Sequence, residues 1–185
     1  MTGEQVRLET ARYILRSVVP DDASEGWQHW SNDPETARWL NTRPREVARE
    51  EIVKYIGSFD DQSRFLIGIF EKHGGRLIGI HSIYVDWERR EYLINVMIGE
   101  TDARNKGARS EARIAVHDYF MEVRGLERSV CTVVDGHPQL AQMRRWGWAI
   151  ERKVQKPAAN GGPAVTLLYM YLTREAWRQA RAVAR

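Results

Sequence analysis

The chain has 185 residues, of which 43% are hydrophobic and 29% charged, a composition that fits one globular domain over residues 1–185 and excludes disordered and collagen-like chains. Lys and Arg exceed Asp and Glu by only 28 − 25 = 3, and both signs are interspersed, which does not favour a nucleic-acid-binding protein. One cysteine, Cys131, cannot form an internal disulfide, and no Cys/His pairs stand at zinc-site spacing, so no metal site is expected.

Hydropathy along the chain gives no export or membrane signal. The first residues, MTGEQVRLE, are polar, and no run approaches the roughly 20 apolar residues of a membrane span. We therefore expect a soluble cytoplasmic protein that does not contact a membrane.

In chain order, the N-terminal part predicts one strand followed by helices. Residues 11–19, ARYILRSVV, alternate and end at Pro20, which predicts a strand. Two short helices are expected around Trp27, Trp30 and Trp39, and a third over 45–59 after Pro44.

The middle and the C-terminal part predict a larger sheet. Alternating segments at 64–71, 77–86 and 91–100, separated by short turns, predict an antiparallel meander. The segment 101–125 then contains a long helix, whose expected apolar face is Ala112, Ile114, Ala115, Tyr119 and Val123. The remaining elements are a strand at 129–134, a short helix at 138–146, two strands at 149–156 and 165–172, and a helix at 174–185. The whole predicts an α/β (α+β) fold with a mixed, mostly antiparallel sheet of about seven strands and helices on both faces.

The loop 104–112, RNKGARSEA, is the most informative stretch because it joins a predicted strand to the start of the long helix. A helix N-terminus offers unpaired backbone N–H groups to a phosphate, and Gly107 would let the ligand approach the backbone. Arg104, Lys106 and Arg109 could add charge-assisted contacts. The same residues would also fit a basic helix start that is exposed to solvent, binds no ligand and has a glycine only to shape the turn. Neither GxGxxG nor GxxxxGK[ST] occurs, so the common dinucleotide and Walker loops are excluded.

These segments resemble the GNAT superfamily of acyl-CoA N-acyltransferases, and in particular its ribosomal-protein-alanine N-acetyltransferase branch. The opening segment LETARYILR (8–16), followed by Asp21, Asp22, Trp30 and Trp39, is similar to that branch. Arg104 and Gly107 match the Q/R-x-x-G-x-G/A coenzyme A loop of the superfamily. The order of predicted elements matches over nearly the whole chain.

The resemblance implies a splay between the fourth and fifth predicted strands that holds acetyl-CoA or another acyl-CoA. An acceptor amine, on a small molecule or a protein N-terminus, would attack the thioester directly, and a backbone N–H near Met97 or Ile98 would polarise its carbonyl. The implied acyl-CoA-binding residues are Met97, Ile98, Arg104, Asn105, Lys106, Gly107, Ala108, Arg109 and Ser110. Self-association into a homodimer is left open.

A carboxylate or imidazole must deprotonate the amine, and four residues near the implied splay are candidates. Glu100, Asp135 and His137 flank the predicted ends of the two strands, and Asn95 lies on the first of them. The same three residues would also fit purely structural roles: a charge at a strand end for Glu100, a turn former for Asp135 and the first residue of a helix for His137. Trp27, Trp30 and Trp39 are candidates for the acceptor pocket.

Three residues depart from the family pattern. Arg109 stands where the loop usually ends in a small residue, and Gly136 and Met143 stand where an Asn and a general-acid Tyr are typical. The leaving thiolate would then take its proton from water, Cys131 or Tyr119. The same departures suggest an alternative, an acyl-CoA-binding domain without catalysis that serves regulation or assembly. A basic nucleic-acid-binding domain is a third reading, and it predicts salt-sensitive binding.

Overall fold

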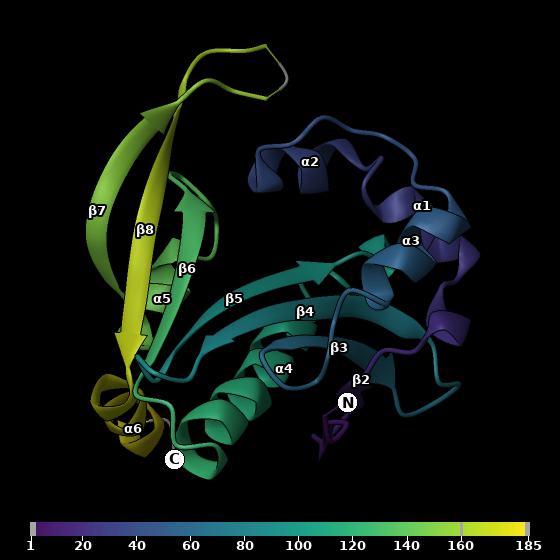
Figure 1. Cartoon of the computed structure of the whole chain (residues 1–185). Helices are drawn as coiled ribbons and strands as arrows, with labels where there is room; N and C mark the ends of the chain where they lie inside the picture. Colours follow the sequence, from purple (N-terminus) through teal and green to yellow (C-terminus); the bar gives the residue numbers. More distant parts are fainter. Residues whose placement is uncertain (1–2, 160, 184–185) are drawn as a thin grey trace.

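The computed structural model describes residues 3–159 and 161–183 and contains one eight-stranded sheet (Figure 1). Its strand order is β1-β2-β3-β4-β5-β6-β8-β7, and every neighbouring pair is antiparallel except β5 with β6. The predicted mixed, mostly antiparallel sheet is confirmed with one strand more than expected. The strands are β1 Arg7–Glu9, β2 Tyr13–Ser17, β3 Arg64–Glu71, β4 Leu77–Asp86, β5 Glu91–Ile98, β6 Arg128–Val134, β7 Ala149–Lys156 and β8 Val165–Thr173.

The additional strand arises at the N-terminus, where the strand predicted over 11–19 is present as β2 and a short strand, β1, precedes it. Residues 10–12 form a tight turn in which the Thr10 amide donates to the Tyr13 carbonyl at 2.9 Å and the Thr10 hydroxyl accepts from the Tyr13 amide at 3.0 Å. This turn folds β1 back onto β2 as an edge hairpin. A strand of three residues has too little alternation for its pattern to be recognised.

Helices cover both faces of the sheet, as predicted. Figure 1 shows α1, α2 and α3 over one face and α4 across the other, with α6 beside the C-terminal end of β8. Among the described residues, none of the helices is long and apolar enough to cross a membrane. The helices are α1 Glu25–Trp30, α2 Pro34–Leu40, α3 Arg49–Ile56, α4 Ala108–His117, α5 Leu140–Arg145 and α6 Arg174–Val183, with short 3-10 turns at Pro20–Asp22 and Thr101–Ala103. Residues 160 and 184–185 of the predicted turn and last helix lie outside the described residues.

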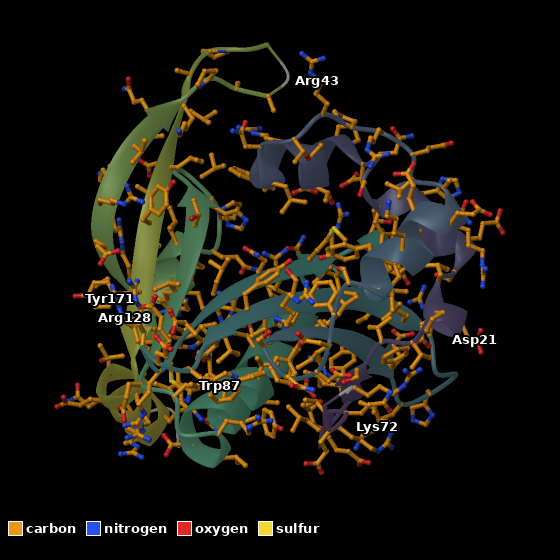
Figure 2. All side chains as sticks on the ribbon, in the orientation of Figure 1. Asp21, Arg43, Lys72, Trp87, Arg128 and Tyr171 are labelled. Carbon is orange, nitrogen blue, oxygen red and sulfur yellow. The ribbon has the colours of Figure 1, made fainter. Side chains whose placement is uncertain are left out.

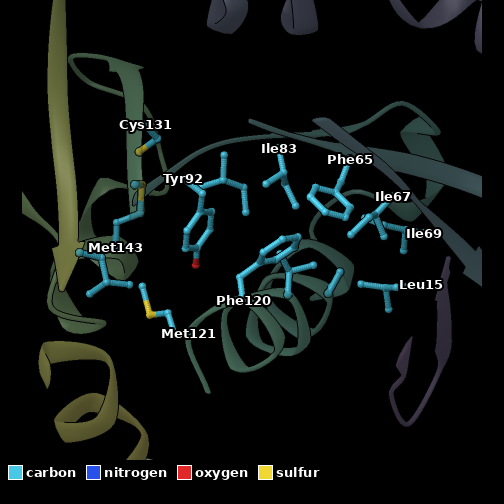
Figure 3. Close-up of a cluster of buried hydrophobic side chains, with 14 of the residues drawn as sticks. Leu15, Phe65, Ile67, Ile69, Ile83, Tyr92, Phe120, Met121, Cys131 and Met143 are labelled. Atoms are coloured by element: carbon cyan, nitrogen blue, oxygen red, sulfur yellow. The ribbon is translucent and has the colours of Figure 1, made fainter. Parts of the chain in front are cut away.

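Two apolar clusters hold these layers together. The larger lies between the sheet and α4, where the rings of Phe65 and Phe120 meet edge to face at 5.2 Å (Figure 3). The smaller packs Trp27 and Trp30, stacked at 5.3 Å, with Ile52 and Ile56 of α3 against the other face. Burial of these apolar surfaces fixes the sheet on which the site is built.

The buried face of α4 differs from the predicted one. The sequence pattern placed Val123 on it, but Val123 is 72% exposed, whereas Arg113 and His117 are buried. Beyond His117 the helix continues as a π-helical segment, Asp118–Val123. The wider turn of a π-helix rotates the residues that follow relative to the buried face of α4. Because the buried residues include charged and polar types, hydrophobic periodicity could not identify this face.

Candidate active site

A cavity of about 460 Å³ opens where β5 and β6 separate. The two strands are paired over only three residue pairs, from Glu91–Arg128 to Leu93–Val130, and they diverge beyond Leu93 (Figure 1). This is the splay expected between the fourth and fifth predicted strands. Its lining comes from α2, β5, the loop before α4, the first turns of α4, β6 and α5. The residues are Glu35, Thr36, Trp39, Leu40, Ile94–Ile98, Ala103–Asn105, Gly107–Ser110, Arg113, Cys131–Val133, His137–Gln139, Ala141–Met143 and Arg145.

The loop before α4 opens on this cavity with unpaired backbone donors. Gly107 is the residue before the helix and has φ +81°, a conformation that favours glycine. No described residue accepts a hydrogen bond from the backbone N–H groups of Gly107, Ala108, Arg109 or Ser110. Four free donors at the positive end of a helix dipole form a site for a phosphate group.

A set of contacts from the N-terminal hairpin holds this loop in place. The Arg12 guanidinium donates to the Glu111 carboxylate at 2.8 Å and to the Lys106 carbonyl at 2.8 Å. The Arg12 backbone amide donates to the other oxygen of Glu111, also at 2.8 Å. The free amides are therefore positioned before any ligand arrives, which lowers the entropy cost of binding.

Arg104 clamps the same loop to α2, and its side chain is engaged within the protein. Its guanidinium lies 2.8 Å from the Asp33 carboxylate and 3.2 Å from that of Glu35, and it donates to the Thr36 hydroxyl at 2.9 Å. It also donates to the carbonyls of Ile98 and Gly99, both at 3.2 Å. A ligand at this position would meet the Arg104 backbone rather than its charge.

The cavity is strongly basic. Four arginines line it, Arg104, Arg109, Arg113 and Arg145, against one carboxylate, Glu35. Burial, together with the charges of Arg113 and Arg104, lowers the pKa of Arg109 to about 10, so the side chain stays protonated at neutral pH. Among the described residues, no carboxylate forms an ion pair with Arg109. The cavity therefore suits an anionic ligand.

The four candidate catalytic residues do not converge. Glu100 is absent from the described cavity lining and accepts from the Trp30 indole at 2.9 Å, with Arg76 3.6 Å away. Asp135 also lies outside that lining and caps its own turn through the Gly136 amide at 2.9 Å. Asn95 lines the cavity and donates weakly to the Ser82 hydroxyl at 3.4 Å.

His137 is the candidate that faces the cavity with a titratable ring. Its Nδ1 accepts from the Gln139 amide at 3.1 Å, and its ring lies 4.8 Å from that of Trp39. Burial and the charges of Arg109 and Arg113 lower the pKa of His137 to about 4. Since the Nδ1 lone pair is used, the neutral ring carries its proton on Nε2, and His137 is a hydrogen-bond donor to the cavity.

Four further side chains complete the walls. Cys131 is 5% exposed, and burial raises the pKa of its thiol to about 12. Ser110 exchanges hydrogen bonds with Gln142 of α5 at 3.0 and 3.3 Å, which joins the helix start to the far side of the cavity.

Of the three candidate tryptophans only Trp39 lines the cavity, while Trp27 and Trp30 belong to the smaller core cluster. Sequence reasoning did not single out Arg113 or Gln142, because a polar residue on a helix usually marks its solvated side.

A strap of two hydrogen bonds joins the segment after α2 to the β7–β8 hairpin. The Arg43 guanidinium donates to the Ala159 carbonyl at 2.8 Å, and the Ala159 amide donates to the Asn41 side chain at 3.0 Å. Figure 2 shows Arg43 at the tip of this hairpin. The strap joins segments more than 110 positions apart in the sequence.

The splayed sheet and the helix start with free amides define the acyl-coenzyme A-dependent class of transferases. The chain belongs to the GNAT acetyltransferase family, since the model of the acetyltransferase (GNAT) domain matches residues 12–147. Acyl transfer from coenzyme A is the chemistry of this family. No curated protein matches the sequence.

Solved structures of GNAT acetyltransferases share the fold at low sequence identity. A GNAT acetyltransferase from Bacillus anthracis superposes with a TM-score of 0.75 and 17% identity, over 92% of this chain and 99% of that one. The ribosomal-protein-S5-alanine acetyltransferase from Vibrio fischeri gives 0.76 and 15%, over 93% and 98%. The spermidine N-acetyltransferase from Vibrio cholerae, solved with CoA and spermine, gives 0.76 and 15%, over 89% and 96%.

Proposed function

We propose that this protein transfers an acyl group from an acyl-CoA to a primary amine by direct attack of the amine on the thioester. The observation that carries the proposal is the row of four free amides, Gly107 to Ser110, at the mouth of the basic cavity between β5 and β6. These amides and Arg109 suit the diphosphate of coenzyme A, and the splay suits its pantetheine arm. The acyl-CoA supplies an activated carbonyl, so the protein needs no nucleophile of its own.

Within that scheme the chain orients the reactants and excludes water. Backbone N–H groups of β5 near Met97 and Ile98 lie in the cavity wall, where a donor aimed at the developing oxyanion lowers the barrier. His137 is a second donor through Nε2. The thiol of Cys131 stays protonated because its pKa is raised to about 12, so it is not a nucleophile. It is also a weaker acid than the leaving thiol, so the thiolate takes the proton that the amine releases.

The shortage of bases favours an acceptor that loses its proton readily. The described lining holds one carboxylate, Glu35, which lies 3.2 Å from Arg104. A peptide α-amine has a pKa near 8, so about a tenth of it is neutral at pH 7, whereas an alkylamine with a pKa near 10.4 is almost entirely charged. We therefore propose a protein or peptide N-terminus as the acceptor, with small amines as the alternative. The relatives named above act on both kinds of amine.

A second candidate function is binding of acyl-CoA without turnover, in regulation or assembly. It draws on the lack of a converging base and on the positions of Glu100 and Asp135 outside the described lining. Release of free thiol in the presence of acyl-CoA and a panel of peptides and amines would separate the two functions. Binding without release in any of these mixtures would favour the second.

Thermal unfolding with coenzyme A and acetyl-CoA tests the binding site itself. A ligand that prefers the folded state raises the unfolding temperature. We expect this rise in the wild type and its loss in Gly107→Trp, since a bulky side chain at φ +81° blocks the free amides. Gly74 in the β3–β4 turn has the same φ of +81° with no atom within 4 Å, so Gly74→Trp is the matched control and should keep the response. A wild type that fails to respond to either compound would overturn the proposed function.

A further inference from the structure

Arg113 carries a buried charge without a partner at the floor of the cleft. It lies on α4 one turn beyond Arg109, is 4% exposed and lines the cavity. Its Nε and Nη1 atoms are buried and make no hydrogen bond to any described residue. Within the described part of the chain no acidic side chain pairs with it, and the indole of Trp148, 6.0 Å from its guanidinium carbon, is its aromatic neighbour.

The groups around Arg113 do not neutralise its charge. Burial lowers the pKa of Arg113, and Cys131 and Tyr92 are the ionisable groups that act against this shift. Both are protonated at neutral pH because burial raises their pKa. His81 and His117 are neutral bases on the same side of the sheet, and the carboxylate of Asp118 is bound by Trp177 at 2.8 Å. A buried, unpaired cation costs several kcal/mol, which a bound anion would offset.

The phosphates of coenzyme A are not suited to this position. Their donors are the free amides and Arg109 at the start of α4, and Arg113 follows about 6 Å further along the helix axis. Arg113 shares the cavity wall with Ile94 and Cys131, directly after Leu93 and Val130, the last pair that joins β5 to β6. This is the closed end of the splay, where an acyl chain that extends beyond the thioester would terminate.

We propose that the acyl donor carries a terminal carboxylate, as in malonyl-CoA or succinyl-CoA, and that Arg113 selects it by a charge-assisted hydrogen bond. The planar guanidinium is matched to a carboxylate, with which it can form two parallel hydrogen bonds. The proposal rests on the proposed function. In the transfer the amine nitrogen forms a bond to the thioester carbon, the carbon–sulfur bond breaks, and the amine proton passes to the released thiol. The distal carboxylate does not react.

Binding of paired acyl-CoAs tests this selection in the wild type. Succinyl-CoA and butyryl-CoA have acyl chains of four carbons and differ in the terminal charge, so their comparison isolates the carboxylate. We expect the wild type to bind succinyl-CoA at least about tenfold more tightly than butyryl-CoA by titration calorimetry. Equal affinities would overturn the proposal. Binding of acetyl-CoA without that preference would leave the proposed function standing, whereas no binding of any acyl-CoA would overturn both.

Substitution of Arg113 assigns the preference to this side chain. Arg113→Met should abolish the preference for succinyl-CoA and keep the affinity for butyryl-CoA, and Arg113→Lys should keep part of the preference. If Arg113 served only the fold, Arg113→Met would lower the unfolding temperature without ligand. We expect that temperature to be unchanged or higher, because the variant removes an unpaired buried charge. A preference for succinyl-CoA that survives in Arg113→Met would refute the assignment.

Discussion

Buried histidines on the α4 side of the sheet are the residues most sensitive to pH. His81 and His117 have no exposed surface, and burial is the main cause of their lowered pKa, with the charge of Arg113 adding to it. The pKa of His81 falls from 6.5 to about 3. His117 Nδ1 is hydrogen-bonded to the Tyr92 hydroxyl, while its Nε2 has no partner among the described residues.

These histidines predict a loss of stability on acidification. Below about pH 6.5 the unfolded chain protonates them and the folded chain does not, so the free energy of unfolding falls as the pH drops from 6.5 toward the folded pKa. Each contributes a slope of up to about 1.4 kcal/mol per pH unit. The free energy of unfolding measured in urea should therefore fall steeply between pH 7.5 and 5. His81→Leu should reduce the part of this fall between pH 6.5 and 5 by about 2 kcal/mol.

A buried substitution that does not titrate provides the control for this series. Ile83 is fully buried on β4 near His81, so Ile83→Val should lower stability by the same amount at every pH. If His81→Leu shows the same slope as the wild type, the histidine does not resist protonation in the folded state and the prediction is wrong.

At the scale of elements, the strands could be predicted and the interior face of α4 could not. β3, β4 and β7 have the bounds expected from their alternation and from the turns that flank them, where Gly74 and Gly75 adopt positive φ. The loop before α4 was also recognised from Gly107 and its position. In contrast, Arg113 and His117 are polar residues on a buried face. Whether such a residue is buried depends on the groups that pack around it in three dimensions, and the hydrophobic pattern of a single sequence does not contain that information.

The clamp between the loop and α2 makes a second element depend on one side chain. Arg104 is 15% exposed and holds Asp33, Glu35 and Thr36 of the α2 segment. A lysine has one point charge and cannot reach these groups together with the Gly99 carbonyl. Arg104→Lys should therefore lower the free energy of unfolding by about 1–3 kcal/mol in urea denaturation.

The exposed pair of Arg89 and Asp86 is the comparison for the clamp. It is separated by 3.6 Å, and the arginine side chain is 80% exposed. Arg89→Lys should change stability by less than about 0.5 kcal/mol. Equal effects of the two substitutions would mean that the clamp contributes no more than a surface ion pair.

At the scale of the whole molecule, the strap between the segment after α2 and the β7–β8 hairpin predicts how quickly ligands exchange. Asn41 adopts φ +49°, so Asn41→Gly removes its side chain without adding strain, and Arg43→Met removes the other half of the strap. The double variant should release bound acyl-CoA several-fold faster in stopped-flow displacement, with little change in unfolding temperature, because the strap lies outside both core clusters.

An arginine outside the strap controls for loss of surface charge. Arg45 pairs with Glu51 at 2.9 Å, and both side chains are more than half exposed. Arg45→Met should leave the release rate at the wild-type value. The same rate in the double variant and the wild type would show that the strap does not limit exchange.

The clamp also has a kinetic consequence. Arg104 belongs to the loop that presents the free amides and, through Asp33 and Thr36, to the helix that forms the opposite wall of the cavity. Binding of a donor to the loop is therefore coupled to α2, which forms the wall that the acceptor meets. Steady-state turnover should accordingly follow a compulsory order, with the acyl donor first and the amine second.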